Sequence, residues 1–167
     1  MTLSPERAGS EEAAKEAALR ILARGPRTER EVEDRLRGRG YDSDAVERAL
    51  ERLRRVSLLD DRAFVRSFLR TELFKAPQAK RLLEMKLRRR GVSDALIREV
   101  DALLEEDPDL AGRSLASEEG RAAAGAAQLR RRYARLKPEL YRRRMEQALA
   151  RRGFGWDTIK EILGENT

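Results

Sequence analysis

The stretch Met145-Glu146-x-x-Leu149-x-x-x-Gly153-Phe154 decides the fold, because the chain contains this pattern three times. Apolar residues placed eight and four positions before a glycine lie on one face of a helix. The glycine supplies a left-handed turn that ends the helix, and the apolar residue after it packs back onto the leucine. The other copies are Val32-Glu33-x-x-Leu36-x-x-x-Gly40-Tyr41 and Leu83-Glu84-x-x-Leu87-x-x-x-Gly91-Val92. The pattern predicts three copies of one helical unit, each closed by a leucine and a glycine.

Each unit is predicted to contain three helices. A proline lies 14 or 15 residues before each glycine, where it can open the motif helix because its missing amide costs little there. One amphipathic segment precedes each proline, and another follows each glycine. An acidic stretch that is also rich in Ser, Ala and Gly separates the second unit from the third. The predicted layout is a disordered tail at 1–10, three-helix repeats at 11–57, 58–106 and 120–164, and an acidic linker at 107–119.

Composition favours a binding or regulatory protein over an enzyme. The 167 residues include no histidine and no cysteine, which removes the commonest general base, the thiolate nucleophile and the usual zinc site. The sequence also has no phosphate loop and no Gly-x-Ser-x-Gly elbow. No apolar run approaches the roughly 20 residues of a membrane span. We expect a cytoplasmic, all-α protein without catalytic residues, cofactor or metal, in which the small repeats lean on their neighbours and form an elongated array of three tandem three-helix repeats.

Positive charge is concentrated toward the end of the chain. Residues 1–119 contain 25 basic and 25 acidic residues, whereas residues 120–167 contain 12 basic and 5 acidic ones, which accounts for the net charge of +7. A further run of arginines closes the second motif helix. Clustered cations of this kind suit a polyanion. The predicted polyanion-binding stripe consists of Arg88, Arg89, Arg90, Arg131, Arg132, Lys137, Arg142, Arg143, Arg144, Arg151 and Arg152.

Two residues of this stripe, together with Arg39 of the first repeat, have a structural alternative. Arg39, Arg90 and Arg152 stand at the ends of the motif helices, where a cation gains roughly 0.3–1 kcal/mol from the helix dipole without any ligand. Binding and helix capping therefore have equal weight at these three positions. The aromatic residues divide in the same way. Those that directly follow a motif glycine are predicted to pack under the turn, and Trp156 is predicted to lie in the core rather than to stack on a nucleic-acid base.

The order of these motifs resembles the RecX family of bacterial regulators over about residues 12–163. The resemblance rests on the three helix–glycine units, on Leu58-Leu59-Asp60-Asp61 followed by Phe64, and on Leu149-Ala150-Arg151-Arg152-Gly153-Phe154 followed by Ile159. The family commonly has a glycine where this chain reads Lys75-Ala76-Pro77-Gln78-Ala79. The resemblance implies a curved, elongated protein that lies along the groove of the RecA nucleoprotein filament. It also implies inhibition of RecA ATPase, strand exchange and coprotease activity, and it brings no catalytic residues.

Two functional hypotheses follow. The first, implied by the resemblance, is a monomeric inhibitor whose basic stripe faces the DNA or an acidic RecA surface of the filament. The second is a DNA-binding protein of tandem helix-turn-helix type, because a three-helix unit with basic helices also outlines that motif. The helices after Gly40, Gly91 and Gly153 begin with acidic residues that repel phosphate. Binding to single- or double-stranded DNA is therefore expected to be nonspecific and sensitive to salt.

Overall fold

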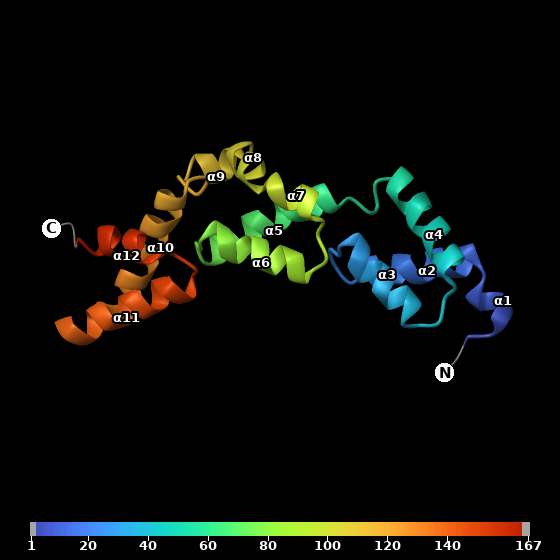
Figure 1. Cartoon of the computed structure of the whole chain (residues 1–167), viewed down its shortest axis with the longest axis horizontal. Coiled ribbons are helices and arrows are strands. Elements are labelled where there is room, and N and C mark those ends of the chain that lie inside the picture. Colours follow the sequence, from blue (N-terminus) through green and yellow to red (C-terminus); the bar gives the residue numbers. More distant parts are fainter. Residues whose placement is uncertain (1–2, 165–167) are drawn as a thin grey trace. The chain divides into compact units, whose positions relative to one another are not determined.

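The structure, a computed structural model, describes residues 3–164, and this part of the chain is built of α-helices without a strand (Figure 1). The all-α class predicted from the sequence is confirmed. The helices are α1 (Pro5–Ala8), α2 (Glu11–Leu22), α3 (Glu29–Arg37), α4 (Ser43–Arg55), α5 (Asp61–Lys75), α6 (Lys80–Arg89), α7 (Asp94–Arg98), α8 (Val100–Glu105), α9 (Pro108–Ala111), α10 (Glu118–Tyr133), α11 (Pro138–Arg151) and α12 (Trp156–Leu163). They form two packing units. The first contains the chain up to Val65 together with Arg88–Ser93, and the second contains Arg66–Leu87 together with the chain from Asp94 onward.

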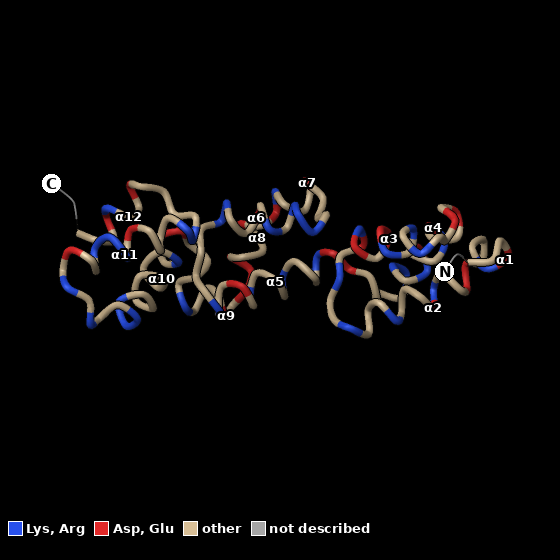
Figure 2. Tube along the Cα trace, turned by 90° about the horizontal axis from the view of Figure 1, so that it is seen from below, with Lys and Arg blue, Asp and Glu red and all other residues tan. Residues whose placement is uncertain are grey.

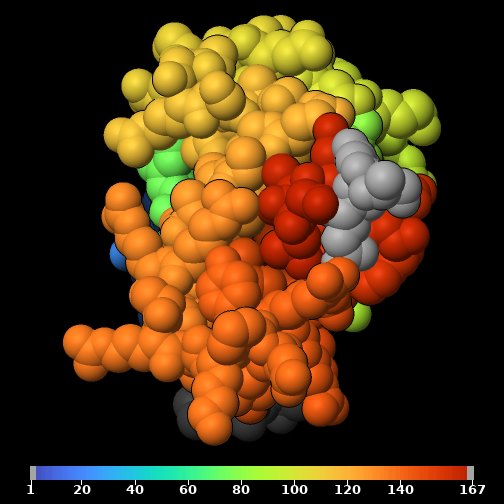
Figure 3. All heavy atoms as spheres, turned by 90° about the vertical axis from the view of Figure 1, so that its left-hand side faces the viewer, coloured from blue at the N-terminus to red at the C-terminus, as the bar shows by residue number. Residues whose placement is uncertain are grey.

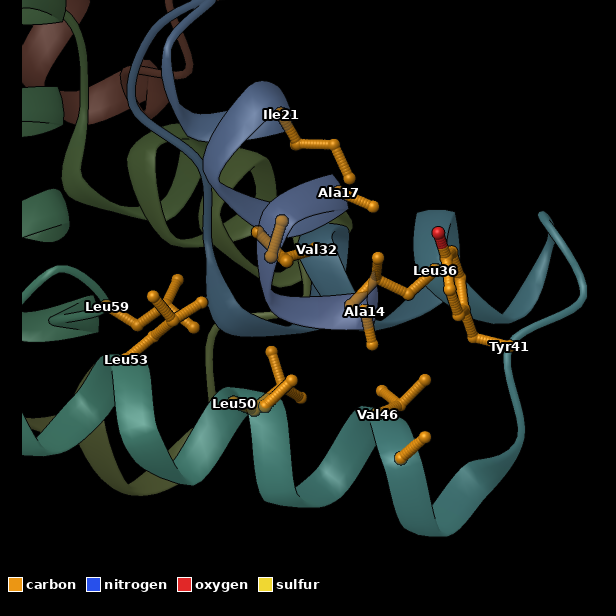
Figure 4. Packing of buried hydrophobic residues seen from close by; sticks show 13 residues of the cluster. Ala14, Ala17, Ile21, Val32, Leu36, Tyr41, Val46, Leu50, Leu53 and Leu59 are labelled. Carbon is orange, nitrogen blue, oxygen red and sulfur yellow. The ribbon is translucent and has the colours of Figure 1, made fainter. Parts of the chain in front are cut away.

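The core of the first unit lies between α2, α3 and α4. Three alanines of α2, at positions 14, 17 and 18, are at most 1% exposed, and such small side chains allow α2 to approach its neighbours closely. Figure 4 shows Val32 and Leu36 of α3 and Leu50 of α4 pointing toward α2. Burial of a Val or Leu side chain contributes about 1.5–3 kcal/mol, so these contacts dominate the stability of the repeat.

The motif glycines end their helices as the sequence predicted. Gly40 has φ +90° and Gly153 has φ +88°, both in the left-handed region. At the first turn the Tyr41 N–H donates to the Leu36 carbonyl over 3.3 Å, and at the third the Phe154 N–H donates to the Leu149 carbonyl over 3.3 Å. The Tyr41 and Phe154 side chains are 6% and 2% exposed. This is the Schellman arrangement, in which the residue after the glycine covers the end of the helix.

The second unit is centred on α10, α11 and α12, whose buried residues form one cluster that also includes Ala79 from the turn before α6. Leu83 and Leu87 of α6 are completely buried. After Gly91 the chain forms two short helices, α7 and α8, which break at Glu99. The prediction that Trp156 lies in the core is wrong. Trp156 begins α12 and is 53% exposed, with the Lys160 ammonium 5.7 Å from its ring centroid.

Two predicted irregular segments contain ordered structure. In the predicted tail at 1–10, residues 1–2 lie outside the described part, and the rest includes α1. The carbonyl of Ala8, the last residue of α1, accepts a hydrogen bond from the Asp42 N–H over 2.9 Å. In the predicted linker at 107–119, α9 and the turn after it bury Leu110 and Leu115. The physical reason is that these two leucines are buried in the second unit and hold the segment in place. The sequence analysis overlooked them because most of the segment is acidic or small.

Candidate filament and nucleic-acid interface

The third repeat brings most of the predicted stripe together on α10, on α11 and on the connection between them. Figure 2 shows lysines and arginines recurring around these two helices, and Figure 3 shows long side chains projecting from the orange segment that holds the end of α10 and the start of α11. We call this the third-repeat basic surface. It consists of Arg131, Arg132, Lys137, Arg142, Arg143, Arg144 and Arg151, all of which are exposed.

The local sequence explains why these cations face solvent. In α11 the residues Met145, Ala148 and Leu149 are buried, so the apolar side of the helix is committed to the core. Arg144 and Arg151 are seven residues apart, which places them on the same side of the helix with about 10 Å between their backbone positions. Extended side chains two turns apart can therefore reach successive negative groups of a polymer.

Few acidic residues neutralise this surface. Arg142 Nε lies 3.2 Å from Glu146 Oε1, and Arg132 lies over the Tyr133 ring at 5.9 Å. No ion pair is found for Arg143, Arg144 or Arg151 within residues 3–164. Partnerless exposed guanidinium groups keep all their donors for a ligand, and their planar fork matches phosphate and carboxylate oxygens.

Arg152, by contrast, points into the protein. Its Nη1 donates to the Gly125 carbonyl over 3.1 Å and to the Pro77 carbonyl over 3.4 Å, and its Nη2 donates to Gln128 Oε1 over 3.2 Å. Burial lowers the pKa of this guanidinium, and the nearby Arg132 lowers it further. The lack of a side chain at Gly125 leaves the space that Arg152 occupies. The structure thus gives Arg152 a role in joining the second repeat to the third.

Arg90 has an equally specific structural role in the first unit. Its guanidinium binds the Glu31 carboxylate through Nε over 2.7 Å and through Nη2 over 2.8 Å, and it stacks over Phe64 at 4.6 Å. The Arg90 carbonyl also accepts a 2.6 Å hydrogen bond from the Thr28 hydroxyl. We call these contacts the Arg90 clasp. Arg88 and Arg89, directly before it, are exposed.

The sequence analysis missed one arginine that supports a motif turn. Arg81, which lies in the first turn of α6, donates from Nε to the Gly153 carbonyl and from Nη2 to the Phe154 carbonyl at 3.5 Å. The carbonyl groups around a helix end lack partners within their own helix, so a cation that reaches them stabilises the turn. The pattern of the motif carries no signal for this contact, because the two residues are 72 positions apart.

The described residues contain neither a helix that could span a membrane nor a cluster of metal-ligating side chains. None of their helices combines the length and the apolar character needed to cross a membrane. Within the same residues, no group of three Asp or Glu side chains is placed so that it could hold a metal ion.

Comparison with known proteins identifies all three repeats. The model of the first three-helix domain of RecX matches residues 14–53, that of the second matches residues 60–100, and that of the third matches residues 119–163. These matches follow the order of the three motif glycines along the chain.

Individual relatives agree over nearly the whole length. The chain is 35% identical over 155 residues to the regulatory protein RecX of Halorhodospira halophila, an alignment that covers 93% of this chain and 89% of the relative. It is 29% identical over 163 residues to RecX of Chlorobaculum tepidum, covering 95% and 94%. The crystal structure of RecX from Lactobacillus salivarius has the same fold, with a TM-score of 0.70 at 23% identity, covering 93% of this chain and 95% of that one. The chain therefore belongs to the RecX family.

Proposed function

We propose that this protein regulates the RecA recombinase by binding the RecA nucleoprotein filament in its groove, and that its main effect is to inhibit RecA ATPase, strand exchange and coprotease activity. Membership of a family of regulatory proteins supports the regulatory part of the proposal. The observation that carries the filament part is the third-repeat basic surface, which offers exposed cations with few acidic partners to a negatively charged polymer.

The repeated architecture suits a polymeric target. Three similar units can meet several subunits of a filament with modest contacts each, and linked contacts reinforce one another through their high effective concentration. A monomer then binds a filament more tightly than it binds one free RecA subunit. Arg88 and Arg89 of the second motif helix belong to the predicted stripe and would add to such binding.

A titration of RecA ATPase tests the proposal. RecA is assembled on single-stranded DNA, and hydrolysis is followed as this protein is added. We expect suppression at amounts well below one molecule per RecA subunit, because each bound molecule affects several subunits. Addition of free single-stranded DNA serves as the control, since an inhibitor that only sequesters DNA would be relieved by it. Unchanged ATPase and strand exchange in excess protein would refute the proposal.

Direct DNA binding of helix-turn-helix type is the second candidate. The third helices of the repeats do not favour it as recognition helices, because Asp42 stands at the N-cap position of α4, Asp94 begins α7 and Asp157 lies in the first turn of α12. Acidic groups at a helix N-terminus repel the phosphates that a recognition helix must approach. With about five phosphate contacts we expect nonspecific binding to duplex DNA whose affinity falls with salt at a logarithmic slope near −4.5. Strong preference for one sequence at physiological salt would favour this candidate instead.

A further inference from the structure

The first repeat contains a small cavity whose lining is almost entirely cationic. Its volume is about 110 Å³, and its walls are formed by Ile21, Arg24, Arg27, Arg35 and Arg39. These arginines come from separate places in the repeat: just after α2, in the connection to α3, within α3, and in the turn that precedes Gly40. The fold gathers them from the first repeat, residues 11–57, where 12 basic and 11 acidic residues nearly cancel, so the net charge gives no hint of the cavity.

The four arginines lack the acidic partners that their neighbours have. In α3, the helix that contains Arg35, Arg30 pairs with Asp34 at 3.1 Å and Arg37 pairs with Glu33 at 2.7 Å. No acidic side chain lines the cavity. Within the described part of the chain, Arg24, Arg35 and Arg39 have no ion pair or hydrogen bond through their side chains.

Arg27 adds an independent observation. Its Nη1 donates to the Pro26 carbonyl over 3.0 Å, but its Nε is buried and has no acceptor among the described residues. A buried donor without an acceptor is costly, and such groups normally find a protein or solvent partner. An anion that draws the Arg27 guanidinium toward the adjacent cavity would give this Nε the acceptor that it lacks.

We propose that this cavity binds a phosphoryl group. Four guanidinium groups repel one another unless an anion lies between them, and a tetrahedral phosphoryl group offers oxygens in several directions to donors from several sides. The size permits this, because the cavity has room for several water molecules and therefore for a group of five heavy atoms. The phosphoryl group belongs either to the DNA backbone or to a free phosphate compound. The site lies outside the predicted stripe and does not depend on the proposed action on RecA.

Two charge-matched double variants test the site without RecA. In the first, Arg35→Gln and Arg39→Gln remove two cations of the cavity. In the second, Arg30→Gln and Arg37→Gln remove two paired cations of the same region. Pyrophosphate and a single-stranded oligonucleotide serve as probes, with pyrophosphate binding followed by thermal unfolding and oligonucleotide binding by fluorescence anisotropy. We expect wild type and the second variant to bind pyrophosphate alike, and the first variant to bind it at least about tenfold more weakly, the effect of one lost charge-assisted contact.

The oligonucleotide arm identifies the source of the phosphoryl group. If the DNA backbone fills the cavity, the first variant also loses oligonucleotide affinity, and its salt slope becomes shallower by about 0.7 for each phosphate lost. If a free compound fills it, only pyrophosphate binding falls. Equal behaviour of the two variants toward both probes would overturn the proposal.

A measurement on the unmodified protein tests the site even if the variants fail to fold. With isotopically labelled arginine, we expect pyrophosphate to shift the Nε–H resonance of Arg27 and to leave that of Arg30 in place. An Arg27 resonance that does not respond at saturating pyrophosphate would contradict the site. Neither outcome depends on RecA, so failure of the ATPase test and failure of this site remain distinguishable.

Discussion

At the scale of single residues, the motif glycines differ in why they must be glycine. Gly40 needs its left-handed φ of +90°, but a Cβ built on it would meet no atom within 4 Å. Gly91 combines φ +78° with close packing, since a Cβ there would lie 2.5 Å from Cβ and Cγ of Arg30. The Arg30 Cβ is fixed by helix α3, so it cannot move aside as the tip of a side chain could.

Substitution by alanine separates these two requirements. We expect Gly40→Ala to destabilise the protein by about 1–2 kcal/mol, the cost of a left-handed conformation for an L-residue. Gly91→Ala should cost about 1–3 kcal/mol more, because the added methyl group overpacks the contact with α3. Urea unfolding of both variants measures the difference. Equal losses would show that the contact between Gly91 and Arg30 relaxes without cost.

The Arg90 clasp makes stability depend on pH through Glu31. Burial alone would raise the pKa of Glu31, but the hydrogen bond and charge of Arg90, together with the Thr28 N–H, outweigh burial and hold this pKa below its usual 4.5. Because the folded state lowers the pKa, the stabilisation is complete above the pKa of the unfolded chain. It is lost as the pH falls through the lower pKa of the folded state.

Glu31→Gln should therefore reduce the free energy of unfolding by about 1–3 kcal/mol near neutral pH, as expected for a lost hydrogen bond to a charged group. The difference between wild type and variant should shrink as the pH falls from the usual carboxyl pKa of 4.5 through the lower pKa of the folded state, where the wild-type carboxylate becomes protonated. Glu16→Gln is the control, since Glu16 is exposed and lies 3.8 Å from Arg20. A constant difference for Glu31→Gln across this range would exclude the linkage.

At the scale of elements, the helix ends were the most predictable features. Glycine, proline and capping residues act on the backbone next to them, so the left-handed turns and the Thr28–Glu31 capping box follow from local sequence. The break between α7 and α8 and the exposure of Trp156 were not predictable in this way. Both depend on which neighbours a helix meets, and a periodic pattern does not specify those neighbours.

The segment at 107–115 shows the same limit. Asp107 caps α9 by accepting hydrogen bonds from the N–H groups of Asp109 and Leu110, and it pairs with Arg70 at 2.8 Å. Burial alone would raise its pKa, but the Arg70 contact and the backbone hydrogen bonds lower it overall. In the sequence Asp107 is one acidic residue among several. Its role depends on Arg70, which lies 37 positions earlier.

A pair of asparagine substitutions tests the importance of this cap. Asp107→Asn should destabilise the protein by about 1–3 kcal/mol, because it weakens the charged contact with Arg70 and leaves an amide in a largely buried site. Asp109→Asn should change stability by less than about 1 kcal/mol, since Asp109 is exposed and surface ion pairs contribute little. Thermal unfolding of the two variants provides the comparison. Similar losses for both would show that the cap at Asp107 contributes little.

At the scale of the whole molecule, the sequence located the excess charge but did not sort its members. Counting residues placed the basic surface in the third repeat, where Arg143 and Arg144 are exposed. It left binding and helix capping with equal weight at Arg90 and Arg152, whose guanidinium groups in fact bind acceptors 59 positions away in Glu31 and 75 positions away in Pro77. It also gave no hint of the arginine cavity, because acidic residues close in sequence to those arginines pair with other side chains.

If the basic surface binds the filament, affinity should depend on the positive charge of its side chains and not on their exact shape. Replacing Arg142, Arg143 and Arg144 with Glu should weaken binding to RecA filaments by at least about tenfold at low salt, since opposite charges become like charges. Replacing all three with Lys should retain most of the affinity. Circular dichroism should show equal helicity for both, because these side chains are exposed. Normal filament binding by the Glu variant would place the interface elsewhere.

The Arg90 clasp has a consequence for any attempt to handle the repeats as modules. Residues 88–93 comprise the end of the second motif helix, α6, and the turn after it, yet they pack in the first unit. A fragment that ends at residue 57 would lack both Phe64 and Arg90, and a longer one that ends after Phe64 would leave that ring exposed. In either fragment Glu31 would have no guanidinium partner. Chimaeras between relatives should therefore exchange residues 88–93 together with the first repeat, so that both sides of the Arg90 clasp come from the same parent protein.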